Sequence, residues 1–233
     1  MERKLKAFTL AEVLITLGII GVVAALTIPT LMQKFDERET VTKMKKMYST
    51  LTTAYQNYFA DNGVPEPQAN NSDGATYVFN IFKPYLKIAQ DCGVTNTGGC
   101  LANVTYKTKD GNNYYNYSTG SAHYKALLAD GSALIFKSNS GSDVYFEVFY
   151  DINGPKGPNQ WGYDLFAFSC YDDGKCFPAD RPTNEQPLGY WFDHNCASSN
   201  AAGAGCAVWV IYKENLDYLK CDDLSWNGKQ KCD

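Results

Sequence analysis

Residues Phe8–Met32 read FTLAEVLITLGIIGVVAALTIPTLM, and this stretch decides how the rest of the chain is organised. Glu12 is its single charged residue, and residues 13–33 carry no charge. A helix of this length spans about 37 Å, which exceeds the ~30 Å hydrocarbon core of a bilayer. We therefore expect a membrane-crossing helix. The alternatives are a plain signal anchor and a secretory signal cut after its apolar core, although Ala24 and Ala25 form no clean A-x-A site.

Charge is distributed unevenly along the 233 residues. Residues 1–7 carry +2, Glu12 carries −1, residues 33–60 carry +2 and residues 61–233 carry −7, which gives the total of −4. The basic side chains Arg3, Lys4 and Lys6 favour a cytoplasmic N-terminus, with the remainder of the chain outside. Because phosphate binding needs clustered Lys and Arg, the acidic C-terminal region makes a nucleic-acid partner unexpected.

The apolar stretch continues into an amphipathic segment. One stripe recurs at three- and four-residue spacing, made of Val41, Met44, Tyr48, Leu51, Tyr55 and Tyr58. After Pro29 no glycine or proline occurs before Gly63. The sequence therefore predicts a single helix from Phe8 to about Ala60, roughly 80 Å long. Its second half is expected to pack on a sheet.

The region after Gly63 favours β-structure. Residues 126–137 read as a hairpin turning at Asp130-Gly131. A helix is predicted over Tyr77–Gln90, in which Pro84 would mark a kink or a first turn. Further strands are predicted over Asp143–Tyr150, Leu165–Ser169 and Val208–Tyr212. The expected fold class is α+β, with a long N-terminal helix packed on an antiparallel sheet.

All eight cysteines lie after residue 90, and this number suggests an oxidising compartment. Eight cysteines allow 105 pairings. Their spacing forms four local couples, so sequential pairing is the expectation for Cys92, Cys100, Cys170, Cys176, Cys196, Cys206, Cys221 and Cys232. Zinc is disfavoured, because the closest pair is Cys170-x5-Cys176 rather than a C-x2-4-C knuckle.

The N-terminus carries a specific order of residues. A short basic leader ends in Ala7, and Phe8, Glu12, the uncharged run and Pro29 follow. This order resembles the N-termini of type IV pilins and type II secretion pseudopilins. The resemblance implies cleavage between Ala7 and Phe8 and N-methylation of Phe8; Ala7 departs from the usual glycine.

The pilin resemblance also implies a division of the chain and a set of partners. Residues 1–7 would be the leader, 8–32 the transmembrane and assembly helix, 33–62 the stem, and 63–233 a pilin-like head. Implied partners are a prepilin peptidase, an assembly platform with its ATPase, and other pilins in a homo- or hetero-polymer. The subunit would span the inner membrane once, with its head outside the cytoplasm, before joining a surface pilus or a periplasmic pseudopilus.

Glu12 has two interpretations. A glutamate in the first turn complements the helix dipole. By resemblance to the pilins, it would instead pair with the Phe8 amine of a neighbouring subunit, an amine that cleavage creates. Pro29 matches the proline that bends the family's helix, since proline removes a backbone donor.

The segment from Asp151 to Asp164, DINGPKGPNQWGYD, is the most distinctive part of the head. Calcium prefers hard oxygen ligands, and Asp151, Asn153, Asn159 and Asp164 could supply them. The spacing is not that of an EF-hand, and Asx turns with prolines are the other explanation. No cofactor other than calcium is suggested.

Catalysis has little support in the sequence. Cys196 beside His194 suggests a Cys–His pair, but a disulfide role for the cysteine is favoured, and His123 is the only other histidine. No G-x-S-x-G, H-E-x-x-H or P-loop motif occurs, so an enzyme is not expected. An alternative function is a membrane-anchored binding protein for a glycan or secreted substrate. Its face would use Tyr114, Tyr115, Tyr117, Tyr124, Trp161 and Trp191, which would otherwise be packing residues.

Overall fold

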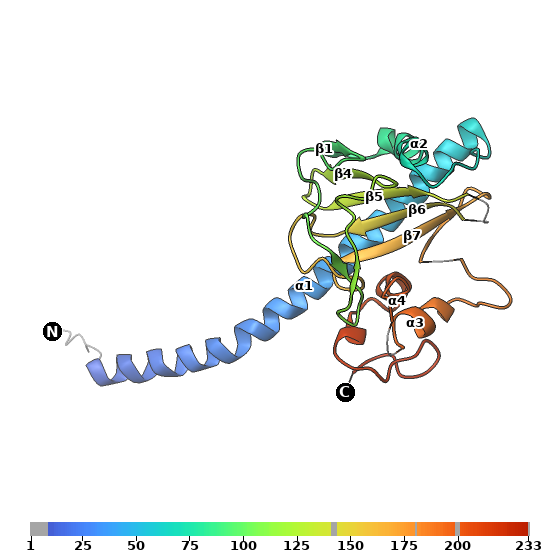
Figure 1. The fold of residues 1–233 in the computed structure, drawn as a ribbon. Coiled ribbons are helices and arrows are strands. Elements are labelled where there is room, and N and C mark those ends of the chain that lie inside the picture. Colours follow the sequence, from blue (N-terminus) through green and yellow to red (C-terminus); the bar gives the residue numbers. More distant parts are fainter. Residues whose placement is uncertain (1–8, 141–143, 180, 199–200, 233) are drawn as a thin grey trace, which may run out of the picture. The chain divides into compact units, whose positions relative to one another are not determined.

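The computed structural model describes residues 9–140, 144–179, 181–198 and 201–232. The chain divides into two compact units, the first ending at Glu39 and the second spanning Thr40–Asp233. The second unit combines helices with a six-stranded antiparallel sheet, so the α+β prediction is confirmed. Figure 1 follows the chain from blue to red through these elements.

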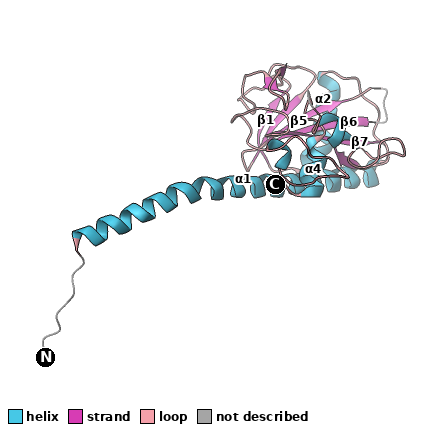
Figure 2. Cartoon of the chain, turned by 90° about the horizontal axis from the view of Figure 1, so that it is seen from below, coloured by secondary structure: helices cyan, strands magenta, loops and turns pink. Residues whose placement is uncertain are grey.

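The first helix, α1, spans Leu10–Asn62, close to the predicted bounds. It continues through Pro29 as one assigned helix. Met44, Leu51 and Tyr55 are fully buried, which confirms the predicted stripe as the packing face of the second half. In both views this half of α1 lies along one side of the strands (Figure 1 and Figure 2).

The predicted helix over Tyr77–Gln90 is correct only in its first part. Helix α2 spans Ser72–Phe82, with Asn71 as its N-cap, and Pro84 lies in the short 3-10 helix η1 at Lys83–Tyr85. Strand β1 then covers Ile88–Gly93. The apolar spacing extended past Pro84, but proline cannot continue the helical hydrogen bonding, so the backbone becomes extended.

The main sheet has the strand order β1-β4-β5-β6-β7-β8, and all its pairs are antiparallel. The further bounds are β4 Tyr124–Leu128, β5 Ala133–Ser138, β6 Val144–Asp151, β7 Leu165–Tyr171 and β8 Cys176–Pro178. The hairpin at Asp130-Gly131 is confirmed, and Gly131 supplies the positive φ of 84° that its turn requires. A two-stranded sheet pairs β2 Tyr106–Lys107 with β3 Asn113–Tyr115.

The two faces of the main sheet support two clusters of buried side chains. Because side chains alternate along a strand, Phe136 and Val148 pack on the side of α1 and α2. Ile135 and Phe149 point to the opposite side and pack with Trp161. The second face is therefore covered by chain segments around the small β2–β3 sheet rather than by a long helix.

The predicted strand over Val208–Tyr212 is wrong. This segment belongs to helix α4, Cys206–Lys213, and its residues from Cys206 to Ile211 are all buried. A helix buried on every side shows no 3.6-residue periodicity, and a short run rich in valine and isoleucine then resembles a strand. Two short helices accompany it, α3 Tyr190–Asn195 and the 3-10 helix η2 Asp217–Leu219.

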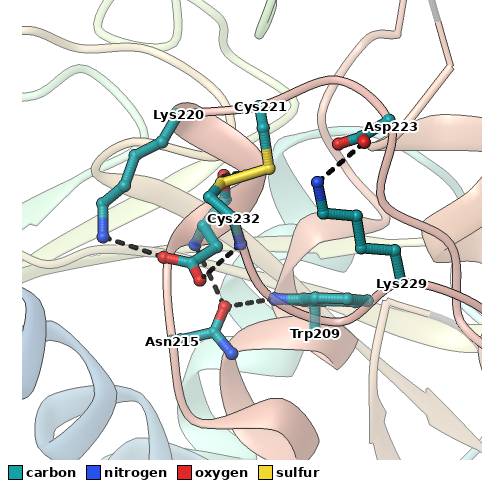
Figure 3. The surroundings of a disulfide bond; sticks show 8 residues. Trp209, Asn215, Lys220, Cys221, Asp223, Lys229 and Cys232 are labelled. Atoms are coloured by element: carbon teal, nitrogen blue, oxygen red, sulfur yellow. Dashed lines mark hydrogen bonds and ion pairs between the residues drawn. A yellow bond between two sulfur atoms is a disulfide. The ribbon is translucent and has the colours of Figure 1, made fainter.

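Four disulfides join Cys92–Cys100, Cys170–Cys176, Cys196–Cys206 and Cys221–Cys232, which is the sequential pairing. Figure 3 shows the surroundings of the last one. Asp217 accepts a hydrogen bond from the Cys232 backbone at 3.2 Å and one from Lys220 at 2.8 Å. The paired cysteines are 6 to 11 residues apart in the sequence, and each closed loop stabilises the fold by ~2–3 kcal/mol in the chain-entropy account.

Candidate functional site

The first turn of α1 is closed by a capping box. The Glu12 carboxylate accepts hydrogen bonds from the Thr9 backbone N–H and hydroxyl, both at 2.9 Å. The Thr9 hydroxyl in turn accepts the Glu12 backbone N–H at 3.2 Å. Reciprocal bonds of this kind satisfy two helix donors that otherwise lack partners. In the single chain, Glu12 therefore stabilises the start of its own helix.

Beyond this cap, the first part of α1 presents apolar side chains to its surroundings. From Leu10 to Phe35 the large apolar side chains are between 42% and 77% exposed. Among the described residues, α1 is the one helix long and apolar enough to cross a membrane by length and composition. Exposed apolar surface on this scale is typical of segments that contact a membrane or another protein.

The predicted processing residues Ala7 and Phe8 lie outside the described residues. Gly18 and Gly21 lie inside α1, and a Cβ placed on either would meet no atom within 4 Å. The two glycines therefore leave the helix surface open to close approach by another helix.

Asp151 and Asp164 are brought together at the open end of the β6–β7 pair. Asp151 is the last residue of β6 and pairs in register with Leu165, the residue after Asp164. Both carboxylates are almost completely buried, at 0% and 1% exposure. Two buried acidic groups at neighbouring positions carry a large electrostatic cost unless other groups compensate it.

Part of the compensation comes from hydrogen bonds within and beside the loop. Asp164 accepts the backbone N–H groups of Asn159 and Gln160, both at 2.7 Å. Asp151 accepts the hydroxyl of Tyr106 at 2.6 Å and the backbone N–H of Asn153 at 3.2 Å. These contacts hold the loop in one conformation.

These hydrogen bonds do not fully offset the cost of burying the two carboxylates. Burial, followed by the charge of Asp164, raises the pKa of Asp151 well above its usual range. Burial also raises the pKa of Asp164, although its hydrogen bonds oppose the shift. Both carboxyl groups are therefore easier to protonate than ordinary aspartates, because burial disfavours their charged form.

Two amide oxygens in the same loop lack hydrogen-bond donors. The side-chain Oδ1 atoms of Asn153 and Asn159 are buried and have no partner among the described residues. The side-chain Nδ2 of Asn153 donates a hydrogen bond to the Gly157 carbonyl at 3.0 Å. An unpaired buried acceptor costs ~1–3 kcal/mol.

The loop therefore offers a set of oxygen donors suited to a hard cation. Among the described residues, no three Asp, Glu, His or Cys side chains gather as a metal-binding group. Two carboxylates and two amide oxygens are ligand types that calcium accepts in proteins. The unpaired Asn153 and Asn159 oxygens are the observation that fits such an ion.

The structure brings together only part of the predicted aromatic face. Tyr114, Tyr115 and Tyr117 lie around a groove of about 300 Å³ on the side of the sheet away from α1, completed by His123, Lys137 and Phe149. Trp161 lies beneath it, 6.3 Å from Tyr114 by ring centroids. Tyr124 lies elsewhere, stacked 4.1 Å from Phe79, and Trp191 does not line the groove.

The Cys–His combination is not assembled as a nucleophile and base. Cys196 is bonded to Cys206, so its sulfur is not a thiolate. His194 is exposed, with its Nδ1 2.8 Å from the Tyr190 carbonyl, and its ring stacks on that of Tyr190. His123 is buried, and burial lowers its pKa to about 4, so it is neutral near pH 7.

Two contributors to these sites were missed by the sequence analysis. Thr9 and Glu12 form the T-x-x-E pattern of a capping box, and that spacing was enough to predict the contact. Tyr106 bonds to Asp151 across a separation of 45 residues, and no local pattern signals such a partner.

Comparison with known proteins identifies no relative, so a functional assignment depends on the sequence and the structural features described above. No protein-family model, curated protein or solved structure matches this chain.

Proposed function

We propose that this chain is a pilin-like structural subunit of an extracytoplasmic filament, either a type IV pilus or a type II secretion pseudopilus. The N-terminal residues that resemble prepilins support the proposal. A prepilin peptidase would release residues 1–7 and leave Phe8 as the new N-terminus. An assembly ATPase and its platform protein would then move subunits from the inner membrane into the filament.

The contrast along α1 is the observation that carries this proposal. The apolar side chains from Leu10 to Phe35 are exposed, whereas Met44, Leu51 and Tyr55 are buried against the sheet. The exposed part suits lipid before assembly and the helices of other subunits after it. A helix whose only task is to pack in a soluble core would not carry so long an exposed apolar surface.

Glu12 has a defined part in this proposal. In the single chain its carboxylate is held by Thr9. On assembly it would exchange this cap for the positively charged Phe8 amine of a neighbouring subunit. An ion pair between a carboxylate and an amine in an apolar filament core favours one axial register over others, because any other register leaves both charges buried and unpaired.

The test is deletion of the gene followed by imaging of the cell surface and assay of secreted proteins. Loss of surface fibres indicates a pilus subunit, and loss of secretion indicates a pseudopilus subunit. Complementation with the full chain restores the phenotype, whereas a chain lacking residues 9–32 does not. Normal fibres and normal secretion in the deletion strain would contradict the proposal.

We also propose that the loop from Asp151 to Asp164 holds a calcium ion through Asp151, Asn153, Asn159 and Asp164. The ion would neutralise the two buried carboxylates. The two amide oxygens that lack hydrogen-bond donors would also coordinate it. Its role is structural, because a bound cation stabilises the folded state over the unfolded state.

Thermal unfolding of the full chain in phospholipid nanodiscs tests the calcium site. At a calcium concentration about 100 times Kd, the folded state gains ~2.7 kcal/mol, and the melting temperature rises. The Asp151→Asn variant loses this rise, whereas Asp61→Asn, at an exposed position, retains it. An unchanged melting temperature on adding calcium to the wild-type chain would dismiss the site.

A further inference from the structure

The aromatic groove, defined by Tyr114, Tyr115, Tyr117, His123, Lys137 and Phe149, has an exposed wall and a buried floor. Tyr114 is 54% exposed and Tyr115 is 40% exposed. Tyr117 and Phe149 are 3% and 6% exposed and form the floor. Adjacent aromatic rings held open to solvent above a packed aromatic base are typical of a ligand-binding surface.

The floor fixes the wall in place. Tyr117 contacts Tyr115 edge-to-face at 5.0 Å and Phe149 at 5.4 Å between ring centroids. Gly120 approaches so closely that an added Cβ would lie 2.5 Å from the Tyr115 hydroxyl. The ring of Tyr115 is therefore positioned before any ligand arrives, which reduces the entropy cost of binding.

The loop that holds the two buried aspartates supports the same wall. The Lys107 backbone N–H donates to the Asn159 carbonyl at 3.0 Å, and the Trp161 backbone N–H donates to the Lys107 carbonyl at 2.9 Å. These bonds attach the loop to strand β2, whose partner β3 carries Tyr114 and Tyr115. The rings thus stand on a hydrogen-bonded scaffold rather than on an unsupported loop.

Among the side chains that line the groove, the one lysine has a carboxylate partner. Lys125, whose charge also lowers the pKa of His123, is fully buried, does not line the groove and donates to two backbone carbonyls. Lys137 forms an ion pair with Glu147, and their side chains are 23% and 25% exposed. Burial lowers the pKa of His123 to about 4, so this residue adds no charge at neutral pH. A groove without net charge favours a neutral ligand, and its Lys–Glu pair offers both donors and acceptors at the edge.

We propose that this groove binds the hexopyranose ring of a neutral glycan, which stacks on Tyr114 and Tyr115. The apolar C–H face of a sugar ring matches an aromatic ring, and its hydroxyl groups both donate and accept hydrogen bonds. A proline-rich peptide would stack on the same rings, but it offers mainly acceptors, whereas sugar hydroxyl groups can also donate to the carboxylate of the Lys137–Glu147 pair. Glycan binding does not depend on whether the chain polymerises.

The experiment uses the full chain in phospholipid nanodiscs, without sugar-based detergents. An array of neutral oligosaccharides of glucose, galactose, mannose and N-acetylhexosamines is screened, and each bound sugar is titrated. We expect at least one to bind, with affinity unchanged between pH 6 and 7, because His123 stays neutral there and Lys125, whose pKa burial lowers to about 8, stays charged. A soluble proline-rich peptide is titrated in parallel.

Three variants locate the binding. Tyr114→Ala is expected to weaken binding about tenfold, whereas Tyr114→Phe, which keeps the ring, changes it less. Tyr163→Ala removes a tyrosine that is 38% exposed outside the groove and should leave affinity unchanged. The proposal is overturned if no sugar binds, if Tyr114→Ala and Tyr163→Ala bind alike, or if only the peptide binds.

Discussion

At the scale of single residues, the chain holds acidic groups where their charge requires a specific partner. Glu12 has such a partner in Thr9, at the start of α1. Asp151 and Asp164 are compensated only in part by hydrogen bonds, and both have raised pKa values. In the proposed function, Glu12 would respond to filament assembly and the two aspartates to calcium binding by the loop.

Substitutions at Glu12 and Thr9 separate the observed capping contact of Glu12 from its proposed pairing with a neighbouring Phe8 amine. We expect Glu12→Ala to remain in the membrane but to enter filaments poorly, because the partner for a neighbouring Phe8 amine is gone. Thr9→Ala breaks the capping box but keeps the carboxylate, so it should still assemble at a helix-stability cost of ~0.5–2 kcal/mol. Quantitative blotting of purified filaments measures incorporation. Equal loss in both variants would mean that Glu12 acts only as a cap.

The raised pKa values of Asp151 and Asp164 predict a specific pH dependence. A carboxyl group whose pKa is higher in the folded chain binds protons more tightly there than in the unfolded chain. Without calcium, its contribution to stability is therefore greatest at low pH and falls as pH rises above the usual value of 3.8. The difference in unfolding free energy between wild type and Asp151→Asn isolates this contribution. The unfolding free energy of the wild type minus that of Asp151→Asn should decrease as the pH rises. An increase with pH would contradict the raised pKa values.

At the scale of elements, α1 is one continuous helix whose first part exposes apolar side chains and whose second part is packed on the sheet. Its buried face carries Tyr55, which is fully buried and donates to the Tyr171 carbonyl at 2.7 Å. The same ring packs edge-to-face on Phe146 at 5.5 Å. This tyrosine therefore ties the helix to two neighbouring strands of the sheet, β6 and β7.

Replacement of Tyr55 should loosen the helix from the sheet. We expect Tyr55→Ala to cost ~3–5 kcal/mol, because it removes a large buried ring. Tyr55→Phe keeps the ring and loses one hydrogen bond, at a cost of ~1 kcal/mol. Denaturant unfolding followed by near-ultraviolet circular dichroism measures both. Exposed Tyr163→Ala serves as the control, and a Tyr55→Ala cost no larger than that of the control would show that α1 is not part of the core.

The elements that sequence could predict are those with strong periodicity or clear turn residues. The stripe from Val41 to Tyr58 and the turn at Asp130-Gly131 led to correct assignments of α1 and the β4–β5 hairpin. The strand predicted over Val208–Tyr212 is wrong, because a helix that is buried on all sides shows no 3.6-residue pattern of apolar residues. The groove and the Tyr106–Asp151 contact depend on long-range placement, which a single sequence does not specify.

At the scale of the whole molecule, the proposal requires that the apolar helix stays attached to the head after processing. Four local disulfides and a sheet with a helix packed on it give the head its own stability. The large apolar side chains of α1 from Leu10 to Phe35, by contrast, are exposed. In the proposed function, lipid would cover them before assembly and neighbouring subunits would cover them afterwards.

The most direct measurement is the intact mass and N-terminal sequence of the protein purified from filaments or membranes of the native cell. The account predicts a chain that begins at Phe8, carries one N-methyl group and retains all of α1. A working protein that still begins at Met1, or one that begins downstream of Thr27, would contradict it.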